Sequence, residues 1–170
     1  MAIGTPAIVG NNSASGSAAT VVITTTVTAP AGQLLLLLWG GDSGAIKTLS
    51  GVADQVSNTY TLGTPADQTG AHVRAAWCQN PVSLPSGNTN TSTANTTDSG
   101  VILVTVPGTL TPTSFDKQGA GSASSGTAPS IAESAAGLAG RIVFGFITIG
   151  TGSADTFTEV LLFIVAGNSF

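Results

Sequence analysis

The 170-residue sequence has very little charge. Only four Lys or Arg and eight Asp or Glu residues are present, so that charged residues make up 7% of the chain. Ordinary soluble domains carry about 25%. The four cations, Lys47, Arg74, Lys117 and Arg141, are scattered along the chain, and the formal net charge is −4, which disfavours binding to nucleic acid. Because so weak a charge protects a β protein poorly from association, we expect the protein to function as part of a larger assembly and not as a free soluble protein.

Cysteine and long apolar runs are also scarce. The single cysteine, Cys78, excludes an intramolecular disulfide and a zinc site built from several thiolates. The most apolar segments, residues 34–39 and 160–166, are far shorter than the ~18 residues of a membrane-spanning helix. The first ten residues, MAIGTPAIVG, lack the basic start and the apolar stretch of a signal peptide. We therefore expect no membrane partner and no export.

Few residues are suited to catalysis. Residues 41–44 read GDSG, the sequence around the nucleophile of trypsin-like serine proteases, but such a serine needs a histidine base and an acid. The single histidine, His72, follows Ser43, whereas the chymotrypsin order places it before the serine. We interpret GDSG as a turn at the end of a strand and expect the protein not to be an enzyme.

Metal ligands are limited to aspartates in predicted loops. These are Asp42, Asp54, Asp67, Asp98, Asp116 and Asp155. Together with backbone carbonyls they could hold calcium, but the sequence has no D-x-[DN]-x-[DN]-G loop. Aspartates also cap turns, so the calcium alternative stays open while the expectation is that no cofactor is bound.

The most distinctive segment is QLLLLLWG, residues 33–40. An apolar run this short, fenced by Pro30 and Gly32 before it and by Gly40 and Gly41 after it, predicts a strand buried on both faces. The domain's own core covers one face. A facing sheet or another subunit is expected to cover the second.

The rest of the chain predicts further strands and no long helix. Strands are expected at residues 18–27, 46–52, 58–62, 88–97, 100–106, 141–149 and 157–166, with 88–97 as an exposed threonine-rich strand. Residues 2–10 suit either a first strand or an arm. Residues 71–79 suit either a helix or a strand, and the flanking Gly70 and Pro81 favour the strand. Residues 63–70 and 122–130 are predicted loops, and 131–138 is the one patch that tolerates a helical turn. The sequence thus predicts an all-β single domain over residues 1–170, an antiparallel β-sandwich or jelly roll of about eight strands.

The order of these segments resembles a known module. The succession VTAPAGQLLLLLWG, VADQVSNTYTL, AAWCQNPVSLPSGNTNTSTA, GVILVTVPG and GSASSGTAPSIAESAAGLAGRIVFGFIT is similar to a β-sandwich that recurs in bacteriophage structural proteins and bacterial surface proteins. The resemblance covers roughly residues 20–150. Gln33 departs from it by standing where an acidic residue is usual, and the turn at 56–58 reads Val-Ser-Asn without the usual glycine. The resemblance implies a non-enzymatic structural or adhesive role.

The leading hypothesis is a virion protein that decorates, or cements, a phage capsid. It would bind the major capsid protein or other virion proteins as a homo-oligomer such as a trimer, and hold the shell by multivalent contacts. Residues 1–12 would be an N-terminal arm and residues 167–170 a C-terminal tail, with fraying as the alternative for both. The candidate interface residues are Ala2, Ile3, Ile8, Val9, Leu34, Leu36, Leu38 and Phe170.

A second hypothesis is a carbohydrate- or receptor-binding module of a phage tail tip or fibre. Its glycan platform would use Tyr60 and Trp77, with Trp39 as a further aromatic candidate. Tryptophan at the end of a leucine-rich strand is also typical of a core, so both interpretations of these rings stay open.

Overall fold

The computed structural model describes residues 4–15, 20–42, 48–68, 71–94, 98–108, 142–145 and 163–166. Within these ranges the chain forms strands and no helix, and the strands pair in antiparallel fashion. The strands are β1 (Ala7–Ala14), β2 (Thr20–Thr24), β3 (Leu34–Asp42), β4 (Gly51–Asp54), β5 (Thr61–Leu62), β6 (Ala66–Gln68), β7 (Ala71–Cys78), β8 (Thr89–Thr93), β9 (Asp98–Val106), β10 (Ile142–Gly145) and β11 (Phe163–Ala166). The all-β prediction is confirmed for this part of the chain.

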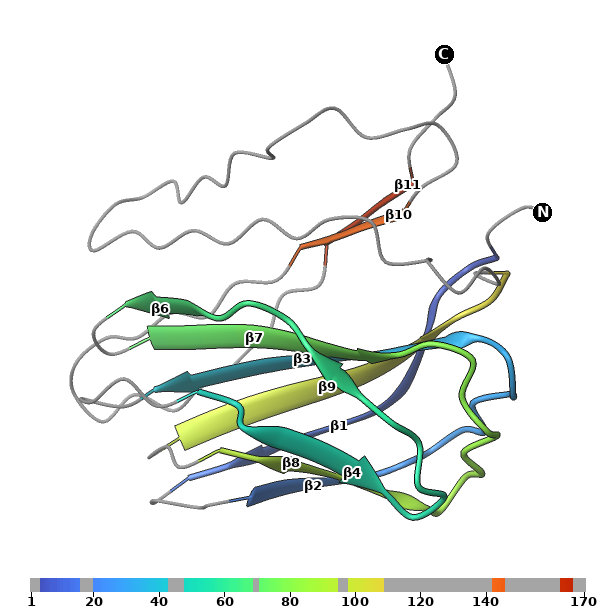
Figure 1. Ribbon diagram of the computed structural model, residues 1–170, viewed down its shortest axis with the longest axis horizontal. Coiled ribbons are helices and arrows are strands. Elements are labelled where there is room, and N and C mark those ends of the chain that lie inside the picture. Colours follow the sequence, from blue (N-terminus) through green and yellow to red (C-terminus); the bar gives the residue numbers. More distant parts are fainter. Residues whose placement is uncertain are drawn as a thin grey trace.

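The strands make two sheets that face each other and one separate pair (Figure 1). The larger sheet has the order β1-β9-β3-β7-β5, with β6 also paired to β7. The smaller sheet has the order β2-β8-β4, and β10 pairs with β11. Neither the predicted count of eight strands nor a jelly-roll topology is confirmed by these sheets.

The leucine-rich strand β3 lies in the middle of the larger sheet, between β7 and β9. Because side chains alternate along a strand, Leu35, Leu37 and Trp39 point into the space between the sheets, where each is 0% exposed. Leu36 and Leu38 point the other way, yet they are only 5% and 1% exposed. The prediction that this strand is buried on both faces is therefore confirmed.

The core between the sheets is built from apolar side chains of both layers. The smaller sheet contributes Val21 and Ile23 of β2, and Leu49 and Leu84 reach in from loops. Each fully buried leucine or isoleucine contributes about 1.5–3 kcal/mol of transfer free energy. This core holds the two sheets in fixed positions.

Strand β1 ties the two sheets together. Its register shifts between Ile8 and Gly10, a β-bulge that sets Val9 apart from the ladder with β9. The Val9 carbonyl accepts a hydrogen bond from the Thr26 amide at 2.8 Å, and a Cβ at Gly10 would lie 2.5 Å from Cγ2 of Ile23. Glycine at position 10 thus permits the close approach of β1 to β2.

Two sequence predictions are wrong in detail. The predicted loop at residues 63–70 contains β6, which pairs with the first half of β7. The predicted exposed strand at 88–97 contains β8, which is the central strand of the smaller sheet and buries Asn90 and Ser92. The predictions for residues 122–130 and 131–138 lie outside the described residues.

Candidate interaction surface

The smaller sheet presents an uncharged face on the side away from the core. We call this the threonine face, and its residues are Thr20, Val22, Thr24, Ala53, Thr89, Thr91 and Thr93. The register places Val22, Thr91 and Ala53 side by side on three neighbouring strands. Strands lie about 4.8 Å apart and alternate residues about 7 Å apart, so that short side chains form a regular array.

The alternation of side chains in β2 and β8 creates this face. Exposed and buried residues alternate along β2, and in β8 the buried residues are Asn90 and Ser92. Ser92 donates its hydroxyl proton to the Val21 carbonyl at 3.1 Å, and Asn90 Nδ2 donates to the Tyr60 hydroxyl at 2.9 Å. The Ser92 hydroxyl and the Asn90 amide nitrogen thus have partners inside the domain, whereas no hydrogen-bond partner is found for the buried Asn90 Oδ1. The threonines face outward.

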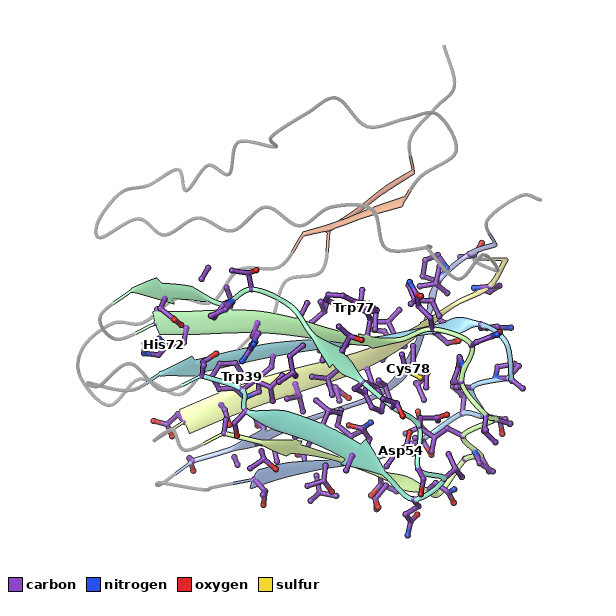
Figure 2. The ribbon with its side chains drawn as sticks, in the orientation of Figure 1. Trp39, Asp54, His72, Trp77 and Cys78 are labelled. Carbon is purple, nitrogen blue, oxygen red and sulfur yellow. The ribbon has the colours of Figure 1, made fainter. Side chains whose placement is uncertain are left out.

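A carboxylate network fixes the turn that follows β4 at one end of the smaller sheet (Figure 2). Asp54 Oδ1 accepts from the backbone amides of Val56 at 3.1 Å and Asn58 at 3.0 Å. Asp54 Oδ2 accepts from Asn58 Nδ2 and from the Tyr60 hydroxyl, both at 2.9 Å. Both oxygens of Asp54 are therefore engaged in holding the turn, which leaves this aspartate poorly suited to ligate calcium.

The turn held by Asp54 contains a residue in a left-handed conformation. Ser57 has φ of 60°, a region that glycine adopts freely and that costs other residues about 1–2 kcal/mol. This turn reads Val-Ser-Asn over residues 56–58, so a residue other than glycine occupies the left-handed position. The hydrogen bonds to Asp54 on either side of Ser57 offset this cost.

The pKa of Tyr60 is raised, first by burial and then by the neighbouring carboxylate of Asp54 and the hydrogen bond to it. Burial and a nearby negative charge both favour the neutral phenol, whereas in the unfolded chain the phenol ionises near pH 10.0. The folded state therefore binds the proton more tightly, and stability is present below pH 10.0 and falls as the pH rises above it.

Ultraviolet titration can check this, because Tyr60 is the only tyrosine of the chain. We expect no tyrosinate absorbance around pH 10 while the circular dichroism remains native, and its appearance together with unfolding at higher pH. Ionisation near pH 10 in a folded protein would contradict the buried position of the hydroxyl.

The residues predicted to form an interface have different environments. Ile8 is 54% exposed on the edge strand β1, and Leu34 is partly exposed at the start of β3. Val9 is 0% exposed, because it packs in the core between the sheets, and Leu36 and Leu38 are also buried. These three therefore do not form an exposed contact surface. The remaining predicted residues, Ala2, Ile3 and Phe170, lie outside the described residues.

The predicted aromatic platform is not assembled from its three rings. Tyr60 packs on the core between the sheets, and Trp39 is fully buried in it. Trp77 lies on the opposite side of β7, where it packs against the cluster of Leu36, Leu38 and Ala75 (Figure 2). The side chains of Tyr60 and Trp77 therefore lie on opposite faces of the larger sheet, and a shared sugar platform is absent.

The single histidine has a structural environment. His72 is fully buried, and its Nδ1 lies 3.2 Å from Oδ1 of Asp67, to which it is directly paired across β6 and β7. Arg74, two residues further along β7, donates from its guanidinium to the carbonyls of Gly63 and Leu49, each at 2.6 Å. Both side chains tie strand β7 to neighbouring segments. Ser43, the candidate nucleophile of the GDSG turn, lies outside the described residues.

The described part of the chain offers no cluster for a metal. In it, no three His, Cys, Asp or Glu side chains come together in a way that could hold an ion. Cys78 is buried between the sheets, and burial, followed by the charge of Asp54, raises the pKa of its thiol. The thiol form is therefore favoured, which is typical of a small core residue.

Sequence reasoning missed the threonine face because it treated the threonine-rich segment as one exposed strand. The signal was the period-two pattern T-x-T-x-T at 89–93, matched by T-x-x-x-T at 20–24. Both patterns place the threonines on one face of a strand. Only the pairing of β2, β8 and β4 brings the residues together.

Comparisons with known proteins identify no relative of this chain. No family model matches the chain, and neither a curated protein nor a solved structure is significantly similar to it. Among the described residues no helix is long and apolar enough to span a membrane.

Proposed function

We propose that this chain is a non-enzymatic structural protein of a virion, with a β-sandwich fold, that decorates the outer surface of a capsid. Its partner would be the major capsid protein or another shell protein, and its task would be to bridge neighbouring subunits. The sequence resemblance to modules of phage structural proteins supports this role, and so does the character of the exposed sheet.

The observation that carries the proposal is the threonine face. No residue of this face is charged, and the cores of protein interfaces are likewise depleted of charged residues. Threonine and valine are stiff at χ1, so fixing them against a partner costs little conformational entropy. The hydroxyl groups can both donate and accept hydrogen bonds, which suits a partner that presents backbone or hydroxyl groups.

A small face of this kind gives only a weak contact by itself. A symmetric homo-oligomer, for which we propose a trimer, would place several copies of the face against several shell subunits at once. The second and third contacts are then intramolecular, and the avidity can exceed that of one contact by about 10²- to 10⁴-fold. This is the mechanism by which we propose that the protein stabilises the shell.

Substitution of Thr91 by lysine tests the proposal. Thr91 lies in the middle of the threonine face, between Val22 and Ala53. A lysine there places an unpaired charge in the contact, so we expect loss of co-sedimentation with capsid shells and an unchanged thermal midpoint. The matched control is Thr59→Lys, an exposed threonine in the turn after β4. If Thr91→Lys bound capsid shells as well as the wild type, the threonine face would not be the contact surface and the proposal would be wrong.

Imaging of virions tests the location. Many copies spread over the head shell are the expected result. A few copies at the tail, together with loss of glycan binding on Trp77→Ala, would instead support the carbohydrate-binding module.

A further inference from the structure

The larger sheet has an apolar face on the side away from the smaller sheet. We call it the outer face, and its residues are Leu36 and Leu38 of β3, Ala75 and Trp77 of β7, and Val104 of β9. The registers place Trp77, Leu36 and Val104 in one row across the three strands, with Ala75 and Leu38 in the next. These side chains therefore form a continuous apolar surface.

The outer face is covered, and the two facing sheets cannot provide the cover. Leu36, Leu38, Ala75 and Val104 are all buried, with Val104 and Leu38 at 0% and 1% exposure. Side chains stand roughly perpendicular to a sheet, so a neighbour in the same sheet shields only the flank of a leucine. The smaller sheet packs on the opposite side. A third layer must therefore lie on the outer face.

The pair of strands β10 and β11 has the properties of that layer. Its described residues are Ile-Val-Phe-Gly and Phe-Ile-Val-Ala, without a single polar side chain. Figure 1 shows the pair on the side of the larger sheet that is away from the smaller sheet, beyond β7. Figure 2 shows Trp77 on this same side of β7.

The needs of the two surfaces are complementary. An isolated pair of strands is marginally stable at best in water and requires an apolar surface to pack on. The β10–β11 pair is only four residues long on each strand, and it is paired in the register Val143 to Val165 and Phe144 to Ile164. The outer face in turn would expose leucine, valine and tryptophan if nothing covered it.

We propose that the β10–β11 pair of the same chain docks on the outer face and forms a third layer of the domain. Leu36 and Leu38 then serve this internal contact and are withdrawn from any contact with a partner. The threonine face, on the opposite side of the molecule, remains available. The inference does not depend on the proposed function, because it concerns contacts within one chain.

Contact quenching of tryptophan fluorescence tests this docking. In the full-length chain carrying Cys78→Ala, a single cysteine introduced as Val143→Cys or Phe144→Cys would be labelled with a nitroxide. Neighbouring residues of a strand point to opposite faces, so one of the two labels points toward the sheet. We expect the nitroxide to quench Trp77, and ascorbate reduction of the label to restore the fluorescence. The additional change Trp39→Phe assigns the signal to Trp77.

The control label is placed at Ala53→Cys, which is exposed on the threonine face, and it should not quench Trp77. Each labelled chain is also unfolded and refolded with an excess of unlabelled chain in which both tryptophans are replaced, Trp39→Phe and Trp77→Phe, so that only the labelled chain fluoresces. Quenching that survives this dilution supports docking within one chain. Relief of quenching on dilution would show that the β10–β11 pair of a second copy covers the outer face. Absence of quenching by both labels in a folded protein would show that the β10–β11 pair does not lie on the outer face. Either result overturns the proposal.

Discussion

Leu36→Asp is expected to unfold the protein as completely as Leu37→Asp. The two residues are neighbours on β3 and point to opposite sides of the sheet, Leu37 into the core and Leu36 onto the outer face. A carboxylate at either site loses its water and meets only apolar side chains, which costs several kcal/mol. Total stabilities of domains are about 5–15 kcal/mol, so we expect a loss of more than about 4 kcal/mol and a mainly unfolded protein at room temperature.

The measurement is urea denaturation followed by tryptophan fluorescence, since Trp39 and Trp77 report the two sides of the sheet. Val82→Asp is the matched control, because Val82 is 62% exposed, and its midpoint should stay within about 0.5 kcal/mol of the wild type. The less drastic Leu36→Ala should cost about 2–5 kcal/mol. If Leu36→Asp folded as stably as the control, the outer face would be open to water and the third layer would be absent.

The central strand could be predicted from the sequence because its signal is local. Five leucines and a tryptophan between turn residues leave no polar side chain to place toward water, so both faces must be covered. Strand β9 was predictable for a similar reason, as a run of β-branched and apolar residues that ends before Pro107 and Gly108. The composition of β7 suits either a helix or a strand, and only the flanking Gly70 and Pro81 favoured the strand. These three strands are the middle of the larger sheet.

The candidate surface could not be predicted in the same way, because it depends on pairing between distant segments. Val22, Ala53 and Thr91 are neighbours only because β2 and β4 both pair with β8. The sequence shows threonines in alternation but not which strands lie beside them. Val9 shows the same difficulty, since only the bulge in β1 and the packing of β1 on β2 decide that it is a core residue. An apolar residue near the start of a chain carries no such information.

The aromatic residues show how tertiary contacts override residue type. Tyr60 is a candidate for a sugar platform because its side chain is aromatic. Its hydroxyl instead donates a hydrogen bond to Oδ2 of Asp54 and accepts one from Nδ2 of Asn90, which is thirty residues away in sequence. A buried tyrosine needs a partner for its hydroxyl, and Asp54 supplies one.

Asp54→Ala is expected to be the most damaging substitution in a partly exposed turn of this protein. It removes the acceptor of four hydrogen bonds, two from backbone amides and two from side chains, and leaves the hydroxyl of Tyr60 without its carboxylate partner. Hydrogen bonds to charged groups contribute about 1.5–3 kcal/mol each, but water can replace some of them at a turn. We expect a loss of about 3 kcal/mol, because the left-handed turn at Ser57 then loses the side-chain hydrogen bonds on either side of it and keeps only backbone and Asn58–Val82 bonds.

Comparison of Asp54→Ala with two milder substitutions distinguishes loss of the Asp54 hydrogen bonds from a general effect of mutating this loop. Tyr60→Phe removes the hydrogen bond to Asp54 and also the acceptor of the buried Asn90 Nδ2, and should cost about 1–2 kcal/mol. Thr59→Ala, at an exposed position next to this turn, should cost less than about 0.5 kcal/mol. The free energies of unfolding from urea denaturation give the order directly. Equal effects of Asp54→Ala and Thr59→Ala would show that the carboxylate does not hold the turn. The expected order would instead identify Asp54 as the residue whose hydrogen bonds hold Ser57, which is not a glycine, in its left-handed conformation.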